Sequence, residues 1–224
     1  MNKLILYLIP LLFINCIAES NKHKIAVHKT YCAIDHDGLV YLPEFELLQN
    51  DVLIKKYKPE LLKNYFVIDS LNSGNYTIRY STIFKMSETV NFNINKKEMD
   101  TVTICLDKIN YDSIKHITFI EKLKNHEEFS IDLWHSGSIS GEGASLKIRK
   151  QDNLFYAKYN GQETKLTPSK VEAIKRFELE LINLNYGGCS VTDNYTLKYN
   201  DEELIIEDRT CNWHGFGPLL MVIF

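Results

Sequence analysis

The first half of the chain alternates apolar and polar residues with a period of two, which is the pattern of half-buried strands. β-branched and aromatic runs at 25–34, 52–57 and 65–70 fit the same element type, and Asp37-Gly38 and residues 72–75 supply turn signals between them. Short strands at this spacing predict an antiparallel β-sandwich over residues 24–110. The alternating apolar positions expected to face its core are Tyr76, Ile78, Tyr80, Phe84, Val90, Phe92, Ile94, Val102, Ile104 and Leu106.

The second half mixes strands with one helix. Alternating apolar residues begin at Phe129 and at Leu146, and Asn160-Gly161 is a strong signal for a two-residue type I′ hairpin turn. Thr167-Pro168 supplies a helix N-cap and a first-turn proline, apolar residues then recur at intervals of three and four, and Gly187-Gly188 is expected to end the helix. Two more strands are predicted at 195–199 and 204–207. The chain is therefore predicted to be mainly β, with a one-helix α+β domain on an antiparallel sheet at 114–224.

The N-terminal residues have the pattern of an export signal. One positive charge, Lys3, precedes an apolar run of eleven residues at 4–14. As a helix this run rises about 16 Å, against roughly 30 Å of bilayer hydrocarbon, so it is too short to span a membrane. A charged start, a short apolar middle and small residues after it predict a signal peptide within residues 1–18.

Two cleavage sites remain open for this signal. Phe13-Ile14-Asn15-Cys16 resembles the lipobox of bacterial lipoproteins, with Asn15 where a small residue is usual, and this resemblance implies a mature chain that begins at a lipidated Cys16. A cut after Ala18 is the alternative, and it would release the protein into the periplasm or medium. The first interpretation predicts a cell-envelope protein that meets the membrane only through its lipid.

The remaining cysteines predict disulfides, because an exported chain matures in an oxidising compartment. Without Cys16 four are left, and four cysteines allow three pairings. Their positions along the chain favour one pair in each half, with four reduced, buried thiols as the alternative. The predicted pairs are Cys32–Cys105 and Cys189–Cys211.

One segment of the first half carries a family resemblance. Residues 69–78, Asp-Ser-Leu-Asn-Ser-Gly-Asn-Tyr-Thr-Ile, are similar to the Leu-x-x-Gly-x-Tyr-x-Ile segment of transthyretin-like, carboxypeptidase-regulatory-like domains of envelope proteins. In that family the module is a non-catalytic β-sandwich. The resemblance covers roughly residues 24–110 and implies the same role for them.

Candidate catalytic motifs are few. Residues 134–145 are rich in Gly and Ser, but Ile139 stands where a nucleophile elbow has its serine, and no helix follows to receive a phosphate. We expect a flexible surface loop there. Residues 35–38 lack the further acidic ligands of a calcium loop, and residues 126–128 lack the second histidine of a zinc helix. No catalytic residue, metal site or cofactor is predicted.

Two tryptophan-histidine pairs are the candidates for recognition. Trp213, His214 and Phe216 have two interpretations: they line a recognition surface together with Trp134 and His135, or Trp213 and Phe216 fill the core. The two histidines are too far apart in sequence to show metal-ligand spacing.

Composition and charge argue against one class of function, nucleic-acid binding. Formal net charge is −3, and Lys and Arg are spread along the chain, so no basic field for nucleic acid is present. The sequence predicts a non-enzymatic envelope lipoprotein that binds an envelope protein or a surface ligand. The alternatives are a secreted hydrolase with His135 or His214 as general base, and a periplasmic inhibitor or immunity-type binder.

Overall fold

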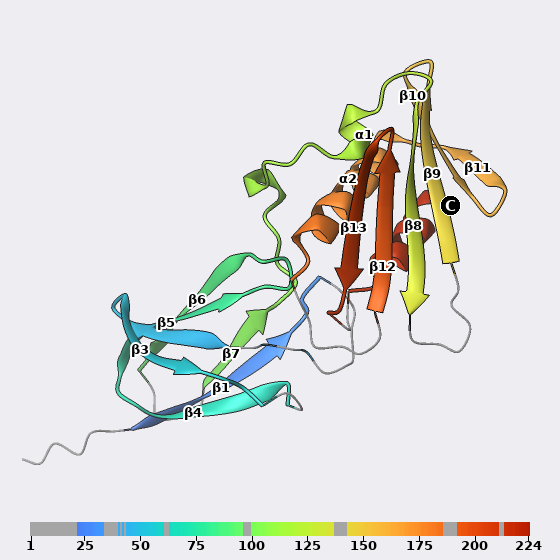
Figure 1. Ribbon diagram of the computed structural model, residues 1–224. Helices are drawn as coiled ribbons and strands as arrows, with labels where there is room; N and C mark the ends of the chain where they lie inside the picture. The colour runs from blue at the N-terminus through green and yellow to red at the C-terminus, as the bar shows by residue number, and fades with distance from the viewer. Residues whose placement is uncertain are drawn as a thin grey trace, which may run out of the picture.

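The computed structural model describes residues 22–33, 40, 42, 44–60, 63–95, 100–136, 143–185, 192–210 and 213–224. Its three β-sheets and few helices confirm the predicted mainly-β fold class. Figure 1 shows the first seven strands at one end of the molecule and the last six strands at the other, and the predicted boundary between two domains stays a prediction. The signal segment, the turn at 35–38, Cys16, Cys189 and Cys211 lie outside the described residues.

The first seven strands form a sandwich of two sheets, in the orders β4-β1-β7 and β3-β2-β5-β6. The alternation that predicted them also places their core, because inward positions such as Tyr76, Ile78 and Ile104 are buried, whereas Val90 and Phe92 are half-buried and pack against that core. Phe84 is buried as well, but it lies beyond the end of its strand. The strands are β1 (His23–Thr30), β2 (Phe45–Gln49), β3 (Val52–Tyr57), β4 (Tyr65–Leu71), β5 (Gly74–Ser81), β6 (Ser87–Ile94) and β7 (Asp100–Cys105).

The sandwich departs from the expected antiparallel pairing at one place. β1 and β7, its first and last strands, run parallel, with Thr30 opposite Cys105. A short turn cannot connect parallel neighbours, and here the five intervening strands form the crossover. The predicted disulfide fastens this pair: Cys32 and Cys105 are bonded, with Cα atoms 5.4 Å apart. Buried Asp107 adds to the fastening, since its carboxylate accepts the backbone N–H groups of Cys32 at 2.8 Å and Ala33 at 2.6 Å.

The third sheet is antiparallel, in the order β11-β10-β9-β8-β12-β13. Asn160 and Gly161 both have positive φ, at 46° and 80°, which confirms the predicted type I′ turn between β10 and β11. The predicted helix is α2 (Pro168–Asn183), and the Thr167 side chain caps it by accepting the N–H of Lys170. The strands are β8 (Glu128–Ser136), β9 (Gly143–Gln151), β10 (Leu154–Tyr159), β11 (Gln162–Lys165), β12 (Thr192–Tyr199) and β13 (Glu202–Asp208).

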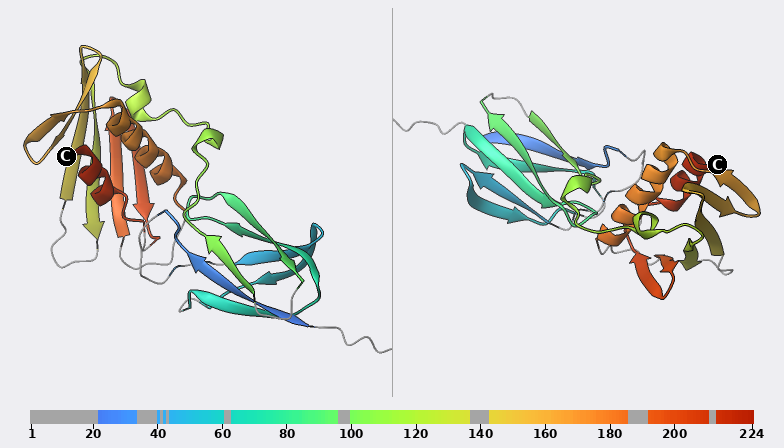
Figure 2. Two further views of the ribbon diagram at one scale, coloured as in Figure 1. Left: turned by 180° about the vertical axis from the view of Figure 1, so that it is seen from behind. Right: turned by 90° about the horizontal axis from the view of Figure 1, so that it is seen from above.

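The structure adds short helices to the single one predicted. They are η1 (Tyr111–Ser113), α1 (Phe119–Lys122) and α3 (Phe216–Ile223). α3 buries Phe216, Leu219 and Ile223, and Figures 1 and 2 show it beside α2 on the same face of the third sheet. α2 ends at Asn183, before the predicted Gly187-Gly188 stop, which lies outside the described residues. In the described part of the chain, helices are too short or too polar to cross a membrane.

A buried carboxylate joins the segment between the sandwich and the third sheet to α2. Glu178 accepts the N–H of Phe119 at 2.6 Å and that of Ile120 at 3.1 Å, so it satisfies the first turn of α1. Thr118 and Glu121 complete a capping box on the same turn. Burial raises the pKa of Glu178 to about 7, although the two N–H donors act in the opposite direction.

This buried carboxyl predicts a pH-dependent stability. Its folded-state pKa is raised, so folded Glu178 keeps a proton at pH values where the unfolded chain has lost it, and stability falls as pH rises towards 7. Asp208, whose pKa burial also raises, acts in the same direction. We expect the free energy of unfolding to fall by roughly 1–3 kcal/mol between about pH 5 and about pH 7.5, since one pKa unit corresponds to about 1.4 kcal/mol.

Urea unfolding at the two pH values measures this effect. Glu178→Gln should reduce the fall markedly. Glu172→Gln is the matched control, because Glu172 is an exposed residue of the same helix that pairs with Arg176 at 3.0 Å. An unchanged fall in the Glu178→Gln protein would contradict the assignment.

Candidate functional site

The strongest surface feature is a pair of edge strands on one side of the sandwich. β3 is the edge of the four-stranded sheet, and β4, which follows it in the chain, is the edge of the three-stranded sheet. On β3 the side chains of Val52, Leu53 and Ile54 are 68%, 45% and 48% exposed. On β4, Tyr65 and Val67 are 63% and 50% exposed. Both edges therefore present apolar side chains together with unpaired backbone groups.

Such edges are unusual because they invite pairing with another strand, and proteins commonly protect them with charges, bulges or covering segments. β3 has a partial protection: Lys55 and Lys56 follow the apolar triplet, and the pairing with β2 shifts register between Leu47 and Leu48. No segment among the described residues covers the three consecutive exposed apolar residues at 52–54. The edge of β3 is thus suited to receive an added strand.

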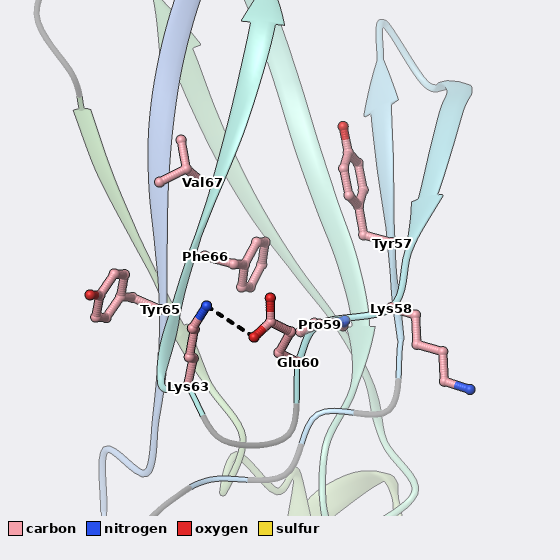
Figure 3. Close-up of a pocket in the computed structure, with 8 residues that line it drawn as sticks. All are labelled: Tyr57, Lys58, Pro59, Glu60, Lys63, Tyr65, Phe66 and Val67. Atoms are coloured by element: carbon pink, nitrogen blue, oxygen red, sulfur yellow. Dashed lines mark ion pairs between the residues drawn. The ribbon is translucent and has the colours of Figure 1, made fainter.

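A groove of about 340 Å³ lies between these two edges, and we call it the edge groove. Figure 3 shows Phe66 pointing into the space between the strands, while Tyr65 and Val67 project from the other side of β4. Phe45 supports the groove from the core, with its ring centre 5.0 Å from that of Tyr57 and 4.8 Å from that of Phe66. The lining residues are Tyr57, Lys58, Pro59, Glu60, Lys63, Tyr65, Phe66 and Val67.

Lysines outnumber unpaired carboxylates around the edge groove, although the Asp69 carboxylate is close enough to act on Tyr57. Glu60 is neutralised by Lys63 at 2.9 Å, as the dashed line in Figure 3 marks. Lys55 lies over the ring of Tyr57, and neither Lys55 nor Lys58 forms an ion pair with the described residues. Burial, with a further contribution from Asp69, raises the pKa of Tyr57, so its hydroxyl remains a hydrogen-bond donor.

Beneath the groove lies a buried lysine. Lys29 on β1 is completely buried, and its ammonium donates to the carbonyl of Glu60 at 3.3 Å. No carboxylate among the described residues lies within ion-pair distance of it. Burial lowers the pKa of Lys29. In its protonated form, the Lys29 ammonium adds to the positive potential behind the groove.

A second hollow of about 480 Å³ lies over the β2–β3 turn and the strands β5 and β6. Its polar side chains are largely paired with one another: Thr77 donates to Asn91 at 2.7 Å, and Asn93 donates to Asn75 at 2.5 Å. This pairing leaves fewer groups for a ligand than the edge groove offers. The hollow is lined by Asn50, Asp51, Asn75, Tyr76, Thr77, Asn91, Phe92 and Asn93.

The structure separates the predicted recognition residues into two groups. Trp134 and His135 on β8 are exposed, and His214 is exposed. Trp213 and Phe216 are buried, at 1% and 4% exposure, so they belong to the core as the second interpretation of that segment expected. These five residues do not form one surface.

His135 nevertheless has an acidic partner. Its Nδ1 lies 2.5 Å from the Asp193 carboxylate, because His135 and Asp193 stand opposite each other on β8 and β12. Asp208 stands opposite Asp193 on β13, and burial raises its pKa, with Asp193 acting in the same direction and His214 against it. The hydrolase hypothesis required a histidine beside a carboxylate, which His135 has, and that hypothesis stays a prediction.

The loop predicted at 134–145 is shorter than expected, because the first three residues of the range end β8 and the last three begin β9. Trp134 lies opposite Gly143 where β8 and β9 pair, and residues 137–142 between them are outside the described residues. In the charge cluster at 126–128, Glu127 accepts the hydroxyl of Tyr199 at 2.5 Å, which is a structural role. Within the described ranges, no group of three His, Cys, Asp or Glu side chains is placed to hold a metal ion.

The sequence did not point to the edge groove. Residues 52–57 were correctly predicted to form a strand. An apolar strand is ordinarily expected to be buried, so its exposure was not predicted. Only strand order reveals that β3 and β4 are both edges. The one sequence signal was Val52-Leu53-Ile54, three consecutive apolar residues where a half-buried strand alternates.

Comparison with known proteins adds no identification: no family model, curated protein or solved structure matches this chain.

Proposed function

We propose that this protein is a non-enzymatic binding module of the cell envelope, and that its sandwich binds an extended, acidic polypeptide segment of an envelope partner along the edge groove. The observation that carries the proposal is the β3 edge, where Val52, Leu53 and Ile54 are exposed at one end and Tyr57 lines the edge groove at the other. An added strand would gain main-chain hydrogen bonds from the edge and apolar contacts from these side chains.

Charge selects the kind of segment. Lys55 and Lys58 border the groove without ion-pair partners among the described residues, and Lys29 lies beneath it. Acidic side chains on the bound strand would pair with the exposed lysines, and such pairing raises the association rate and weakens with salt. A basic segment would be repelled.

Location in the envelope belongs to the same proposal. The apolar run at 4–14, which is followed closely by Cys16, supports export and lipidation, and two or more acyl chains at that residue would hold the protein at a membrane without a spanning helix. The Cys32–Cys105 disulfide fits an oxidising compartment. The intact mass of the N-terminal peptide, in wild type and in Cys16→Ala, tests this part.

Selection from a displayed library of random dodecapeptides tests the binding mode. We expect selected peptides rich in Asp, Glu and β-branched residues and poor in Pro, with affinities in the micromolar range by fluorescence anisotropy. The double variant Val52→Glu/Ile54→Glu should weaken the best peptide about tenfold or more, because it replaces apolar contacts on the pairing edge with charges of the same sign as the peptide.

The opposite edge of the same sheet supplies the control. β6 is that edge, and Asn91→Glu/Asn93→Glu adds the same two charges to exposed positions on it. Peptide affinity should stay within about twofold in this variant. Equal losses at the two edges, or selected peptides that are basic, would overturn the proposal.

A further inference from the structure

The third sheet has one face that nothing in the described structure covers. Figures 1 and 2 show α2 and α3 on one side of the sheet and open strands on the other. Successive side chains of β8 point to opposite faces of the sheet. Phe129 and Ile131 are buried on the face that the helices cover. Ser130, Asp132 and Trp134 point to the open face. Trp134 is 54% exposed there.

The residue opposite Trp134 on the neighbouring strand determines where the indole ring can lie. Its cross-strand neighbour on β9 is Gly143, and a Cβ built on that glycine would lie 3.3 Å from Cε3 of the indole. The ring therefore rests against a strand backbone that has no side chain of its own, an arrangement known to shield glycines in sheets. Trp134 is thus a supported aromatic surface, with much of its area available to a ligand.

Hydrogen-bonding groups surround this surface. Asp132, two residues earlier on the same face, accepts the hydroxyls of Ser145 at 2.6 Å and Ser130 at 3.2 Å, and no cation among the described residues pairs with it. Asn194 stands opposite Trp134 on β12 and donates to Ser136 at 3.3 Å. These groups keep hydrogen-bonding capacity for a polyol, because a carboxylate can accept about four bonds and Asn194 still has a second N–H and its carbonyl oxygen.

Most described charges farther out on this face have partners, and the exceptions, Lys158 and Lys165, stand on β10 and β11, two and three strands away from β8. Arg149 pairs with Glu163 at 2.9 Å, and Lys198 pairs with Glu203 at 3.4 Å. Lys147 pairs with Glu128 at 3.2 Å. On β8 and on its neighbours β9 and β12, each described cation of this face is therefore paired, which disfavours a phosphate-bearing or otherwise anionic ligand and favours a neutral one.

We propose that Trp134 and the polar residues beside it form a binding site for a neutral carbohydrate. The apolar face of a pyranose ring stacks on the indole, and its hydroxyl groups bond with Asp132 and Asn194. This site lies on another sheet from the edge groove and does not depend on peptide binding there.

The chain contains only two tryptophans, which makes the test specific. Trp213 is buried, so collisional quenching by acrylamide reports mainly on Trp134. We titrate the full-length protein with three neutral hexasaccharides (cellohexaose, maltohexaose and N-acetyl-chitohexaose) and with anionic hexagalacturonate. At least one neutral hexasaccharide should protect the fluorescence and bind with a dissociation constant on the order of 0.1 mM by calorimetry.

Variants decide whether the proposed residues form the site. Trp134→Ala should weaken binding of that hexasaccharide about tenfold or more, and Asp132→Asn about threefold or more, with unchanged melting temperature in both. Ile205→Ala is the control, since Ile205 is 72% exposed on the same face. No binding of any neutral hexasaccharide at about 10 mM, preferential binding of hexagalacturonate, or binding unaffected by Trp134→Ala would overturn the proposal.

Discussion

Replacing both Cys32 and Cys105 by alanine is expected to lower the free energy of unfolding by about 4 kcal/mol. The two residues are 73 positions apart in sequence, and a cross-link that closes a loop of this size restricts the unfolded chain strongly. For a chain of this length such a loss lowers the melting temperature by roughly 10 °C. Urea unfolding of the oxidised proteins measures the difference directly.

The position of this bond explains why we expect nearly the full effect. It joins the ends of β1 and β7, the only pair of strands in the described sandwich that runs parallel. Leu106 also donates its N–H to Thr30 at 2.9 Å, and Asp107 accepts two N–H groups of the segment that follows β1. These contacts close the sandwich between its first and last strands, so they lose their alignment when the bond is absent.

A variant is a better measure than a reductant in this protein. A reductant would also act on Cys189 and Cys211, which the sequence predicts as a second pair. The Cys189→Ala/Cys211→Ala protein is therefore the comparison, and its shorter loop predicts a smaller loss, of about 3 kcal/mol. A loss under about 1 kcal/mol for the Cys32/Cys105 variant, or alkylation of these two thiols in the native protein, would contradict the prediction.

Local patterns in the sequence predicted most elements, because their causes are local. The alternation of Tyr76, Ile78 and Tyr80 required a strand with one buried face, and the structure has it. Thr167-Pro168 and Asn160-Gly161 set a helix start and a hairpin turn through the conformations that these residues prefer.

Features that depend on pairing between strands far apart in the sequence could not be predicted from local patterns. The parallel pairing of β1 with β7 and the juxtaposed edges of β3 and β4 follow from strand order, which no local window contains. The contact of His135 with Asp193 likewise arises from the pairing of β8 with β12. Glu178 is a further example, since its carboxylate is buried only because α1 presents two N–H groups to it.

α3 was predictable from the sequence only in part. Phe216, Leu219 and Ile223 recur at intervals of three and four, which is a helical signal, but Gly217 and Pro218 argue against a helix. The proline stands in the first turn, where its missing N–H has no partner to lose. Packing of the three apolar residues then decides the conformation, as tertiary contacts commonly do for short helices.

Trp213→Ala is expected to have the largest effect of a single substitution, a loss of about 3–5 kcal/mol in the free energy of unfolding. The Trp213 ring is buried, with its centre 5.4 Å from that of Phe177 and 5.7 Å from that of Tyr195. Its Nε1 donates to Glu180 at 3.0 Å, and Glu180 also accepts the hydroxyl of Tyr111. Alanine would leave a cavity in this aromatic cluster and remove the indole donor from Glu180.

The two tryptophans of the chain make a matched pair for this test. Trp213→Phe removes the hydrogen bond but keeps much of the ring, so it should cost less than Trp213→Ala, about 1–2 kcal/mol, and it provides a readout if the alanine protein does not fold. Trp134→Ala removes an equally large side chain from an exposed position and should change stability by no more than about 0.5 kcal/mol. Urea unfolding of the three variants compares them under one condition. A loss under about 1 kcal/mol for Trp213→Ala would contradict the prediction, because a buried indole that contacts Phe177 and Tyr195 cannot be removed at so little cost if these contacts stabilise the fold.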